Sequence, residues 1–499
     1  MVATLALPTT ECLLISGGDA RIQPDPVSGV SVYGCLPHPD PTLIALGSST
    51  ASTISAAGFA AADALRNSCA ERLRHQSAFR VYADETERLR ATLPRLAIAP
   101  FSDSVRVVLA ASGTDLHLLV AQWLVPNRII TVAPTETGNG VSAALSGRHF
   151  NDRTAYGGVF TVGDALHSQC NTSLVTLSPR HPDGELRTTD EFNAEYAAHV
   201  DQAVTAGERV LLVLTDVSKT ALILPDITLV RSLKGRWPDQ VEVLVDACQF
   251  RLAPPTIAAY LAEGWMVALT GSKFIAGPAF CGCLLAPHSV SERYRDRVLH
   301  PSVGVYSSAA DWPSDWSVTR ELPESVNFGL LLRWEAAVTE LNAFYEVPNR
   351  AAADFLRQFG QAVRQHIATD ECLQALSVRE LSRPWPESGD GELPWDREQT
   401  IFPFLLYQPG NDGIARPLGY DETMQIYQAF LHQTQQTQPR FQFGKPVPFR
   451  QSDGTPIGAL RLAVSAPMVV SACRDGKLSQ MIGNALAALD EVARFVKTM

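Results

Sequence analysis

The feature that most constrains the fold is a pattern that repeats between about residues 104 and 287, where a short apolar run is followed by a turn and a helical stretch. The runs are rich in Val, Leu and Ile without polar alternation, which is typical of strands buried on both faces of a sheet. They are Val105–Ala111, Arg128–Ala133, Ser173–Leu177, Val210–Leu214, Val241–Val245, Met266–Leu269 and Gly282–Ala286. Helical candidates such as Asp115–Leu124 and Pro255–Glu263 lie between them. This alternation predicts an α/β fold whose large domain has a mostly parallel seven-stranded sheet sandwiched by helices.

The pattern changes after Pro323, where longer helices and fewer strands are expected. The expected elements are helices at Asn327–Tyr345 and Pro348–Ile367, a strand at Ile401–Tyr407, a helix from about Glu422 to Thr434, a strand at Ala459–Val464 and a final amphipathic helix from about Leu478 to Val496. They predict a smaller α+β domain, which the N-terminal segment completes. We therefore expect a large domain at 65–325 and a small domain formed by 1–64 and 326–499.

Composition excludes several classes of function. The 499 residues carry 41 basic and 52 acidic side chains, a net charge of −11, so the basic footprint of a nucleic-acid-binding protein is missing. The nine cysteines form no disulfide framework, and Cys281 and Cys283 lack the second pair that a zinc site needs, so no metal is expected. The first basic residue is Arg21, and no apolar stretch is long enough to span a bilayer. We expect a cytoplasmic protein without a membrane partner.

A first candidate site is the turn that joins the run Val105–Ala111 to the next helix. Ser112, Gly113 and Thr114 place a hydroxyl, a glycine and a second hydroxyl at a helix N-terminus, where free N–H groups and the helix dipole favour a phosphate. An ordinary helix cap would use the same residue types, so the turn alone decides nothing.

Two further candidates follow later strands. Asp246 closes the run Val241–Val245, and a carboxylate at the end of a buried strand requires a polar partner. Lys273 follows Met266–Leu269 and a glycine turn, and only six of the 41 basic residues are lysines. Burial lowers the pKa of a lysine and prepares its amine to react with an aldehyde. A capping aspartate and a lysine that reaches solvent are the structural alternatives.

The order of these three segments favours one cofactor. A helix N-terminus for a phosphate, a carboxylate for a ring nitrogen and a lysine for an aldehyde are the contacts that pyridoxal 5′-phosphate (PLP) needs. Gly138–Ala143 matches the dinucleotide pattern G-x-G-x-x-A, but four residues separate it from the preceding run and no acidic residue follows at the right distance. A nicotinamide enzyme is therefore the weaker interpretation.

Over roughly residues 40 to 495 the chain resembles the fold-type I PLP enzymes, in particular the class V aminotransferase and cysteine desulfurase superfamily. Asp246-Ala-Cys-Gln249 resembles the family's Asp-x-x-Gln segment, which implies that Asp246 pairs with the ring nitrogen and Gln249 with the phenolic oxygen. Thr270-Gly-Ser-Lys273 resembles its lysine segment. This implies that Lys273 carries the cofactor and is catalytic, with Thr270 or Ser272 on the phosphate beside Ser112, Gly113 and Thr114.

The resemblance extends to three other segments. Arg461, on an expected strand, is similar to the arginine that holds the substrate α-carboxylate, a task that suits a bidentate guanidinium. Ser49 lies in a segment similar to the one that lines the substrate side of the pocket. Asn327 lies where the family reaches across a dimer interface to the neighbouring phosphate. A homodimer with a shared active site is implied by this likeness alone.

The sequence also departs from the family. The desulfurases carry a catalytic cysteine shortly before the arginine strand, whereas this chain has Phe441–Val447 there and its nearest cysteine, Cys473, lies beyond Arg461. Thr137 stands where relatives often stack a histidine on the cofactor ring, so stacking is either absent or supplied by His149. Lys219 stands where relatives often carry an asparagine. It is either a second amine that binds substrate and carries protons, or a solvated lysine.

These observations predict an enzyme that acts on an α-amino acid through an external aldimine, with amino-group transfer as the reaction. A PLP-dependent lyase or β-replacement enzyme is the alternative, because the same residues serve each reaction. A PLP-fold protein that no longer catalyses is a more distant alternative, since Lys273 and Asp246 are both retained.

Overall fold

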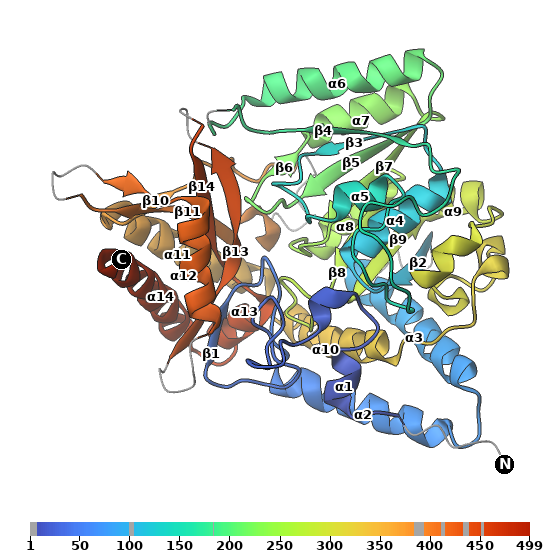
Figure 1. Ribbon diagram of the computed structural model, residues 1–499, viewed down its shortest axis with the longest axis horizontal. Helices are drawn as coiled ribbons and strands as arrows, with labels where there is room; N and C mark the ends of the chain where they lie inside the picture. Colours follow the sequence, from blue (N-terminus) through green and yellow to red (C-terminus); the bar gives the residue numbers. More distant parts are fainter. Residues whose placement is uncertain are drawn as a thin grey trace.

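Two β-sheets, one in each part of the chain, organise the structure (Figure 1). The computed structural model describes residues 7–98, 104–182, 184–383, 394–410, 415–432, 439–450 and 454–499. In the view of Figure 1 the larger sheet lies at the upper right and the smaller one at the left, with the N-terminal segment below and between them. None of the helices in the described ranges is long and apolar enough to cross a membrane.

The larger sheet has eight strands in the order β2-β9-β8-β7-β5-β3-β4, with β6 beside β5. These are β2 Val105–Ala110, β3 Arg128–Val132, β4 Ser173–Leu177, β5 Val210–Asp216, β6 Ile223–Leu224, β7 Val241–Ala247, β8 Met266–Thr270 and β9 Gly282–Pro287. Strands β8, β7, β5, β3 and β4 run parallel, whereas β9 and the two-residue β6 run antiparallel to their neighbours. The predicted mostly parallel sheet is confirmed, and each of the seven expected strands lies within a few residues of its predicted bounds.

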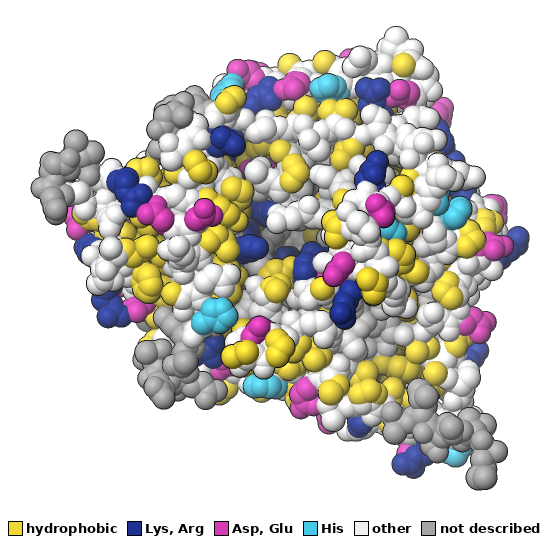
Figure 2. Space-filling model, in the orientation of Figure 1, with side chains coloured by type: hydrophobic (Ala, Val, Ile, Leu, Met, Phe, Trp, Pro, Cys, Tyr) yellow, Lys and Arg dark blue, Asp and Glu magenta, His cyan; other side chains and the backbone are white. Residues whose placement is uncertain are grey.

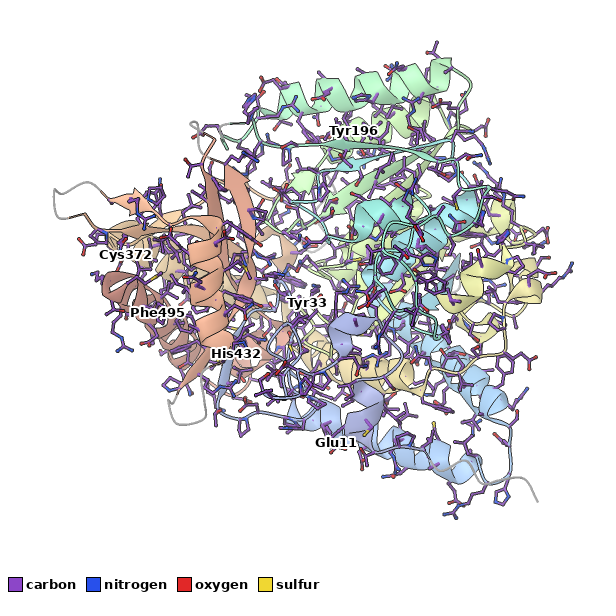
Figure 3. The ribbon with its side chains drawn as sticks, viewed as in Figure 1. Glu11, Tyr33, Tyr196, Cys372, His432 and Phe495 are labelled. Atoms are coloured by element: carbon purple, nitrogen blue, oxygen red, sulfur yellow. The ribbon has the colours of Figure 1, made fainter. Side chains whose placement is uncertain are left out.

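Helices cover both faces of this sheet, which explains the continuous apolar runs. Along β2, Val107 and Leu109 belong to one buried cluster, and Val108 and Ala110 belong to the other. Both faces of the strand are therefore buried, so polar and apolar residues do not alternate along it. Tyr196 illustrates the packing on one face, where its buried hydroxyl donates to the carbonyls of Ile130 and Val213 at 2.6 and 3.0 Å (Figure 3).

The helices of this part fall into two groups. One face is covered by α3 Ala78–Ile98, α6 Thr189–Thr205, α7 Ile227–Arg236 and α8 Pro254–Ala262. The other is covered by α4 Gly113–Leu124, α5 Val141–Leu145 and α9 His288–Tyr294. Together they form the three-layer arrangement that buries a parallel sheet.

The smaller sheet has the order β1-β13-β14-β11-β10, with β12 beside β11. Its strands are β1 Leu43–Leu46, β10 Leu373–Ala375, β11 Ile401–Gln408, β12 Arg416–Pro417, β13 Arg440–Arg450 and β14 Pro456–Ala463. Strand β1 pairs in parallel with β13, so the N-terminal segment contributes to this sheet. The 441–447 stretch, compared above with a loop of the desulfurases, lies within strand β13.

The remaining helices are α1 Thr10–Leu14, α2 Ala56–Arg72, α10 Phe328–Tyr345, α11 Asn349–Thr369, α12 Tyr420–Leu431, α13 Ala466–Cys473 and α14 Leu478–Thr498. Helix α10 packs against α2, α3 and α13, so it joins the two parts of the chain. Helix α14 buries Leu489, Val492 and Val496, as its stripe predicts, and leaves Leu478 half-buried. Helix α12 begins at Tyr420, while the expected end at Thr434 falls outside the described residues.

Candidate active site

The carboxyl ends of several strands meet at one edge of the larger sheet. Asp246 on β7 pairs in register with Thr215 of β5 and Ala268 of β8. Gly282, at the start of the antiparallel β9, pairs with both Thr270 of β8 and Ala110 of β2. The three candidate segments therefore leave the sheet at the same edge, where α/β folds bind their ligands.

The predicted phosphate turn is the N-terminus of α4, with Ser112 as its cap. A side chain at Gly113 would place its Cβ 2.7 Å from the sulfur of Cys248 and 3.2 Å from Thr270 Cγ2, so only glycine allows this close approach. The Thr270 hydroxyl donates to the Cys248 carbonyl at 2.5 Å, and the Ser272 hydroxyl lies 3.5 Å from that of Thr270. The structure thus brings the five predicted phosphate ligands to one helix N-terminus.

The fifth, Thr114, faces the loop after β3. A Cβ at Gly140 would lie 3.1 Å from Thr114 Cγ2, so this loop packs directly on the first turn of α4. Asp115 follows, and its carboxylate accepts a hydrogen bond from the Ser112 hydroxyl. Burial raises the pKa of Asp115 to about 7, which leaves it partly neutral beside a site suited to an anion.

Asp246 has a partner that sequence reasoning missed. His117 lies one turn into α4, with Nδ1 2.7 Å from the Gly113 carbonyl and Nε2 3.2 Å from an Asp246 oxygen, while the Cys248 N–H donates to the other oxygen at 3.2 Å. Burial works against a charged imidazole, but the facing carboxylate outweighs it and raises the pKa of His117. Burial would likewise raise the pKa of Asp246, and the histidine holds it below its usual range. Asp246 is therefore kept ionised.

His117→Leu is expected to lower the free energy of unfolding of the protein without cofactor by about 3–5 kcal/mol, because the variant leaves a buried carboxylate without its counter-charge. The raised pKa of His117 gives stability that is complete below 6.5 and is lost as pH rises through the folded-state value. The lowered pKa of Asp246 gives stability present above 3.8 and lost as pH falls through its folded-state value. Denaturant unfolding should therefore show a larger deficit near pH 6 than near pH 9.

A second variant tests the pairing itself. His117→Leu combined with Asp246→Asn removes both charges, so we expect it to lose less stability than the sum of the two single variants. Equal deficits at both pH values, together with additive losses, would contradict the ion pair.

Lys273 follows β8, and its amine donates to the Thr50 carbonyl. Burial, followed by the positive charge of Arg461, lowers the pKa of Lys273 to about 8. Burial and the charge of Asp246 raise the pKa of the Cys248 thiol, and the charge of Lys273 acts to lower it. An amine with this pKa is far more often neutral at physiological pH than an ordinary lysine.

Thr50 connects the N-terminal segment to three parts of the site. Its carbonyl accepts from Lys273, and its hydroxyl oxygen accepts from Arg461 Nη2 and from the Lys445 N–H, both at 2.9 Å. Arg461 is 2% exposed, and its other hydrogen bonds go to the carbonyls of Lys445 and Ser49. Buried Arg440, in contrast, has the Asp40 carboxylate 2.6 Å away. Arg461 is therefore a buried cation whose hydrogen bonds all go to uncharged acceptors.

Gln249 and Ser49 also meet here. The Gln249 amide donates to the Ser49 carbonyl at 3.0 Å, and the buried Ser49 hydroxyl has no hydrogen-bond partner among the described residues. Gly444 on β13 pairs with Arg461 on β14, and a Cβ on Gly444 would lie 2.4 Å from the Ser49 hydroxyl oxygen. Ser49 thus contacts both Gln249 and the strand pair that carries Arg461, and the predicted roles of Ser49 and Gln249 toward substrate and cofactor stay predictions.

The loop after β3 carries Thr137, which is 4% exposed, and two groups that accept hydrogen bonds from Lys219. Asn139 and the Pro134 carbonyl accept from the Lys219 amine at 2.9 and 3.2 Å. Burial, followed by Arg461, Lys273 and Lys445 in smaller measure, lowers the pKa of Lys219 to about 7. Lys219 is therefore half-buried among the site's cations rather than on an open surface. His149 stacks on Phe160 at 4.0 Å instead.

Asn327 has a clear role within its own chain. It caps α10 by accepting from the Leu330 N–H at 3.0 Å, and its amide donates to the Gly17 carbonyl at 2.9 Å. Its predicted reach to a neighbouring subunit's phosphate stays a prediction. Through Gly17, Asn327 thus contacts the 15–35 segment. Tyr33, which belongs to this segment, lies between the two sheets (Figure 3). The positive charge of Arg21, which belongs to this segment, acts to lower the pKa of both Asp115 and Lys273.

Two cysteines bear on the comparison with desulfurases. Cys473 lies at the end of α13, where its thiol donates to the Ala351 carbonyl at 3.5 Å, away from Arg461. Cys35 lies closer, with Gln442 Nε2 3.6 Å from its sulfur. Burial raises the pKa of the Cys35 thiol, which therefore stays protonated and is a weak nucleophile.

Figure 2 shows a depression in the middle of this face, between the two sheets, with Lys and Arg side chains around it. Among the described residues, His, Cys, Asp and Glu side chains nowhere gather in a group of three that could hold a metal ion.

Comparisons with known proteins give a structural match only. No protein-family model matches the sequence, and no curated protein matches it. A cysteine desulfurase from Thermococcus onnurineus NA1, solved in the apo form, superposes with a TM-score of 0.52 at 11% identity, over 90% of this chain and 94% of that one. A C-DES mutant with glycine covalently linked to its PLP cofactor gives 0.51 at 12%, over 89% and 96%.

A NifS-like protein from Rickettsia africae ESF-5 gives a TM-score of 0.50 at 9% identity, over 90% of this chain and 99% of that one. The likeness covers both parts of the chain and nearly the full length of each similar structure. The chain therefore has the fold of a cysteine desulfurase and a NifS-like protein, which is the fold type I architecture that its sequence resemblance implies.

Proposed function

We propose that this chain is a PLP-dependent enzyme that acts on an α-amino acid. The observation that carries the proposal is the convergence of the α4 N-terminus, the Asp246 carboxylate and the Lys273 amine at one sheet edge, opposite the buried cation Arg461. Each is a group that PLP or an amino-acid carboxylate needs, and no local pattern requires them to meet. The C-DES structure, which has the same fold, contains PLP by its description.

The residues fit the cofactor in charge and in shape. The N–H groups and hydroxyls at the start of α4, with Thr270 and Ser272, suit a phosphate, and Gly113 lets the helix approach closely. Asp246, kept ionised by His117, suits a protonated ring nitrogen. Thr137 lies on the loop that packs against Thr114, and Gln249 lies between Asp246 and Ser49. When bound, PLP supplies an electron sink for the amino-acid Cα.

The protein's own groups then have distinct tasks. Lys273 would hold the cofactor, and its amine can move a proton to or from the substrate Cα. Arg461 orients the α-carboxylate by charge-assisted hydrogen bonds. Lys273 is half-buried, and its amine is held by the Thr50 carbonyl, next to the smaller sheet that carries Arg461.

We propose amino-group transfer as the reaction, in which Lys273 serves as the proton carrier. A lyase or β-replacement reaction is the second candidate. It is supported by the similar structure described as a cysteine desulfurase and by Lys219, a second amine with a pKa lowered to about 7 that could protonate a leaving group.

The first test is the absorption spectrum of the purified protein before and after borohydride, followed by peptide mapping. We expect a visible band that disappears on reduction and a pyridoxyl group on the peptide that contains Lys273. Incubation with amino acids and keto acids then separates transfer, which needs a keto-acid acceptor, from elimination, which does not. A protein that stays colourless with added PLP would contradict the proposal.

The rate at which PLP becomes attached to the cofactor-free protein is expected to rise with pH and level off above about pH 8. Attack on the aldehyde requires a neutral amine, and burial lowers the pKa of Lys273 to about 8. Borohydride trapping at timed intervals between about pH 6 and pH 10 measures this rate. A rate that continues to rise tenfold per pH unit up to pH 10 would show an ordinary lysine.

A further inference from the structure

The site holds more positive charge than one α-carboxylate can balance. Arg461, Lys219 and Lys445 come from three different elements, and the hydrogen bonds described above take Arg461 and Lys219 to uncharged acceptors. In the described part of the chain, none of the three forms an ion pair with a carboxylate. This local excess of positive charge occurs in a chain whose net charge is −11.

Geometry places these cations together. Strand β13 contains a bulge between Gly444 and Val447, where three steps on β13 oppose two on β14, and such bulges redirect a side chain. Lys445 lies in the bulge, where its N–H donates to the Thr50 hydroxyl oxygen and its carbonyl accepts from Arg461. Because the same Thr50 accepts from Lys273, the bulge lies beside the catalytic amine.

Lys219 closes the other side of this group. Its backbone N–H donates to the Glu136 carbonyl at 2.8 Å, and its amine binds Asn139 on the loop that packs against Thr114. The positive charges of Arg461, Lys273 and Lys445 help to lower the pKa of Lys219. The Lys445 amine has no hydrogen-bond partner within the described ranges.

Among the described residues, the carboxylate of Glu136 acts on this group; hydroxyl groups engage one of its oxygens, and its Oε1 has no hydrogen-bond partner. Glu136 is 1% exposed, and its Oε2 accepts from the hydroxyls of Ser218 and Thr220 at 2.6 and 2.7 Å. Arg461, Lys445 and the partly protonated Lys219, whose pKa is lowered to about 7, still outweigh the single charge of Glu136 after an α-carboxylate binds Arg461. A second anionic group on the substrate would balance the remainder.

We propose that Lys219 and Lys445 form a second anion subsite, and that the substrate is an amino acid whose side chain carries a further carboxylate. The inference rests on the proposed function, since it takes Arg461 as the α-carboxylate contact. Arg461 and the lysine pair would bind the two ends of a dicarboxylic ligand, with the Lys273 amine near the atoms between them.

The test measures binding of small carboxylates to the PLP-loaded protein by titration calorimetry at constant ionic strength. We expect succinate or glutarate to bind about 10-fold or more tightly than butyrate, because each charge-assisted hydrogen bond contributes at least that factor. Lys445→Gln and Lys219→Gln should each remove most of this preference and leave butyrate binding unchanged. Lys477→Gln, which changes an exposed lysine at the N-cap of α14, is the matched control.

Equal affinity for succinate and butyrate in the wild-type protein would overturn the inference, as would an equal loss of both ligands in the Lys445→Gln protein. Tighter binding of 3-phosphonopropionate than of succinate would assign the subsite to a phosphate-like group and also overturn the carboxylate assignment. Cofactor loading is verified first from the borohydride-reduced peptide. A loaded protein without dicarboxylate preference refutes only the subsite, whereas failure to load refutes the proposed function.

Discussion

Lys273→Ala is expected to abolish covalent attachment of PLP and to lower turnover by a factor on the order of 10²–10⁴ or more, the usual contribution of a positioned acid–base group. The side chain makes one hydrogen bond, to the Thr50 carbonyl, so its removal leaves the packing of β8 intact. Steady-state rates and borohydride peptide mapping check both parts of this result. Thermal unfolding of the variant should match that of the wild-type protein to within a few degrees.

Two other lysines sharpen this experiment. Lys497→Ala changes an exposed lysine paired with Glu371 at 3.0 Å and should leave attachment and turnover unchanged. Lys219→Ala should retain the pyridoxyl group on Lys273. Wild-type turnover in Lys273→Ala, or a pyridoxyl group mapped to Lys219, would refute Lys273 as the cofactor lysine.

Arg461→Ala is expected to lower kcat/KM for α-amino acids by about 30- to 3,000-fold, which corresponds to about 2–5 kcal/mol for loss of one partner of a buried charge pair. The loss should be much smaller for amines that lack the carboxylate, because they never used the guanidinium. Rates with an amino acid and with its decarboxylated amine separate these cases. If Arg461 binds substrate and transition state equally, the loss appears mainly in KM.

Controls distinguish this role from a structural one. Arg461 also holds the carbonyls of Lys445 and Ser49, so the unfolding temperature of the variant must be measured beside its kinetics. Arg350→Ala, at an exposed position of α11, is the matched substitution. An unchanged KM and kcat for α-amino acids in a folded Arg461→Ala protein would remove the carboxylate contact.

Local patterns were sufficient for the larger sheet. Runs such as Val241–Val245 are apolar on both faces because helices cover both faces, so the sequence alone predicts these strands and a mostly parallel sheet. The structure lengthens β5 and β7 to Asp216 and Ala247, since polar residues at a strand end continue the backbone ladder without needing an apolar side chain. The short strands β6, β10 and β12 carried no periodic signal.

Tertiary contacts decided the partners. From the sequence, His117 is only one more residue of a buried helix. No local pattern indicates that it contacts Asp246, which lies on a strand over a hundred residues later. Thr50 directly follows Ser49 in the sequence, yet its hydrogen bonds to Lys273 and Arg461 span 223 and 411 residues. Glu136 could be recognised only as an acidic residue between two turn residues.

The sequence by itself therefore determined the α/β architecture, the order of phosphate turn, aspartate and lysine, and the arginine on a late strand, because each depends on short-range periodicity and residue chemistry. Only the tertiary structure decided which charges face one another. The pairing of Asp246 with His117, the half-buried position of Lys219 and the gathering of Arg461 with Lys445 at a β-bulge all depend on contacts between distant segments. Such contacts arise when hydrophobic burial closes long loops, and no periodicity along the chain encodes where those loops close.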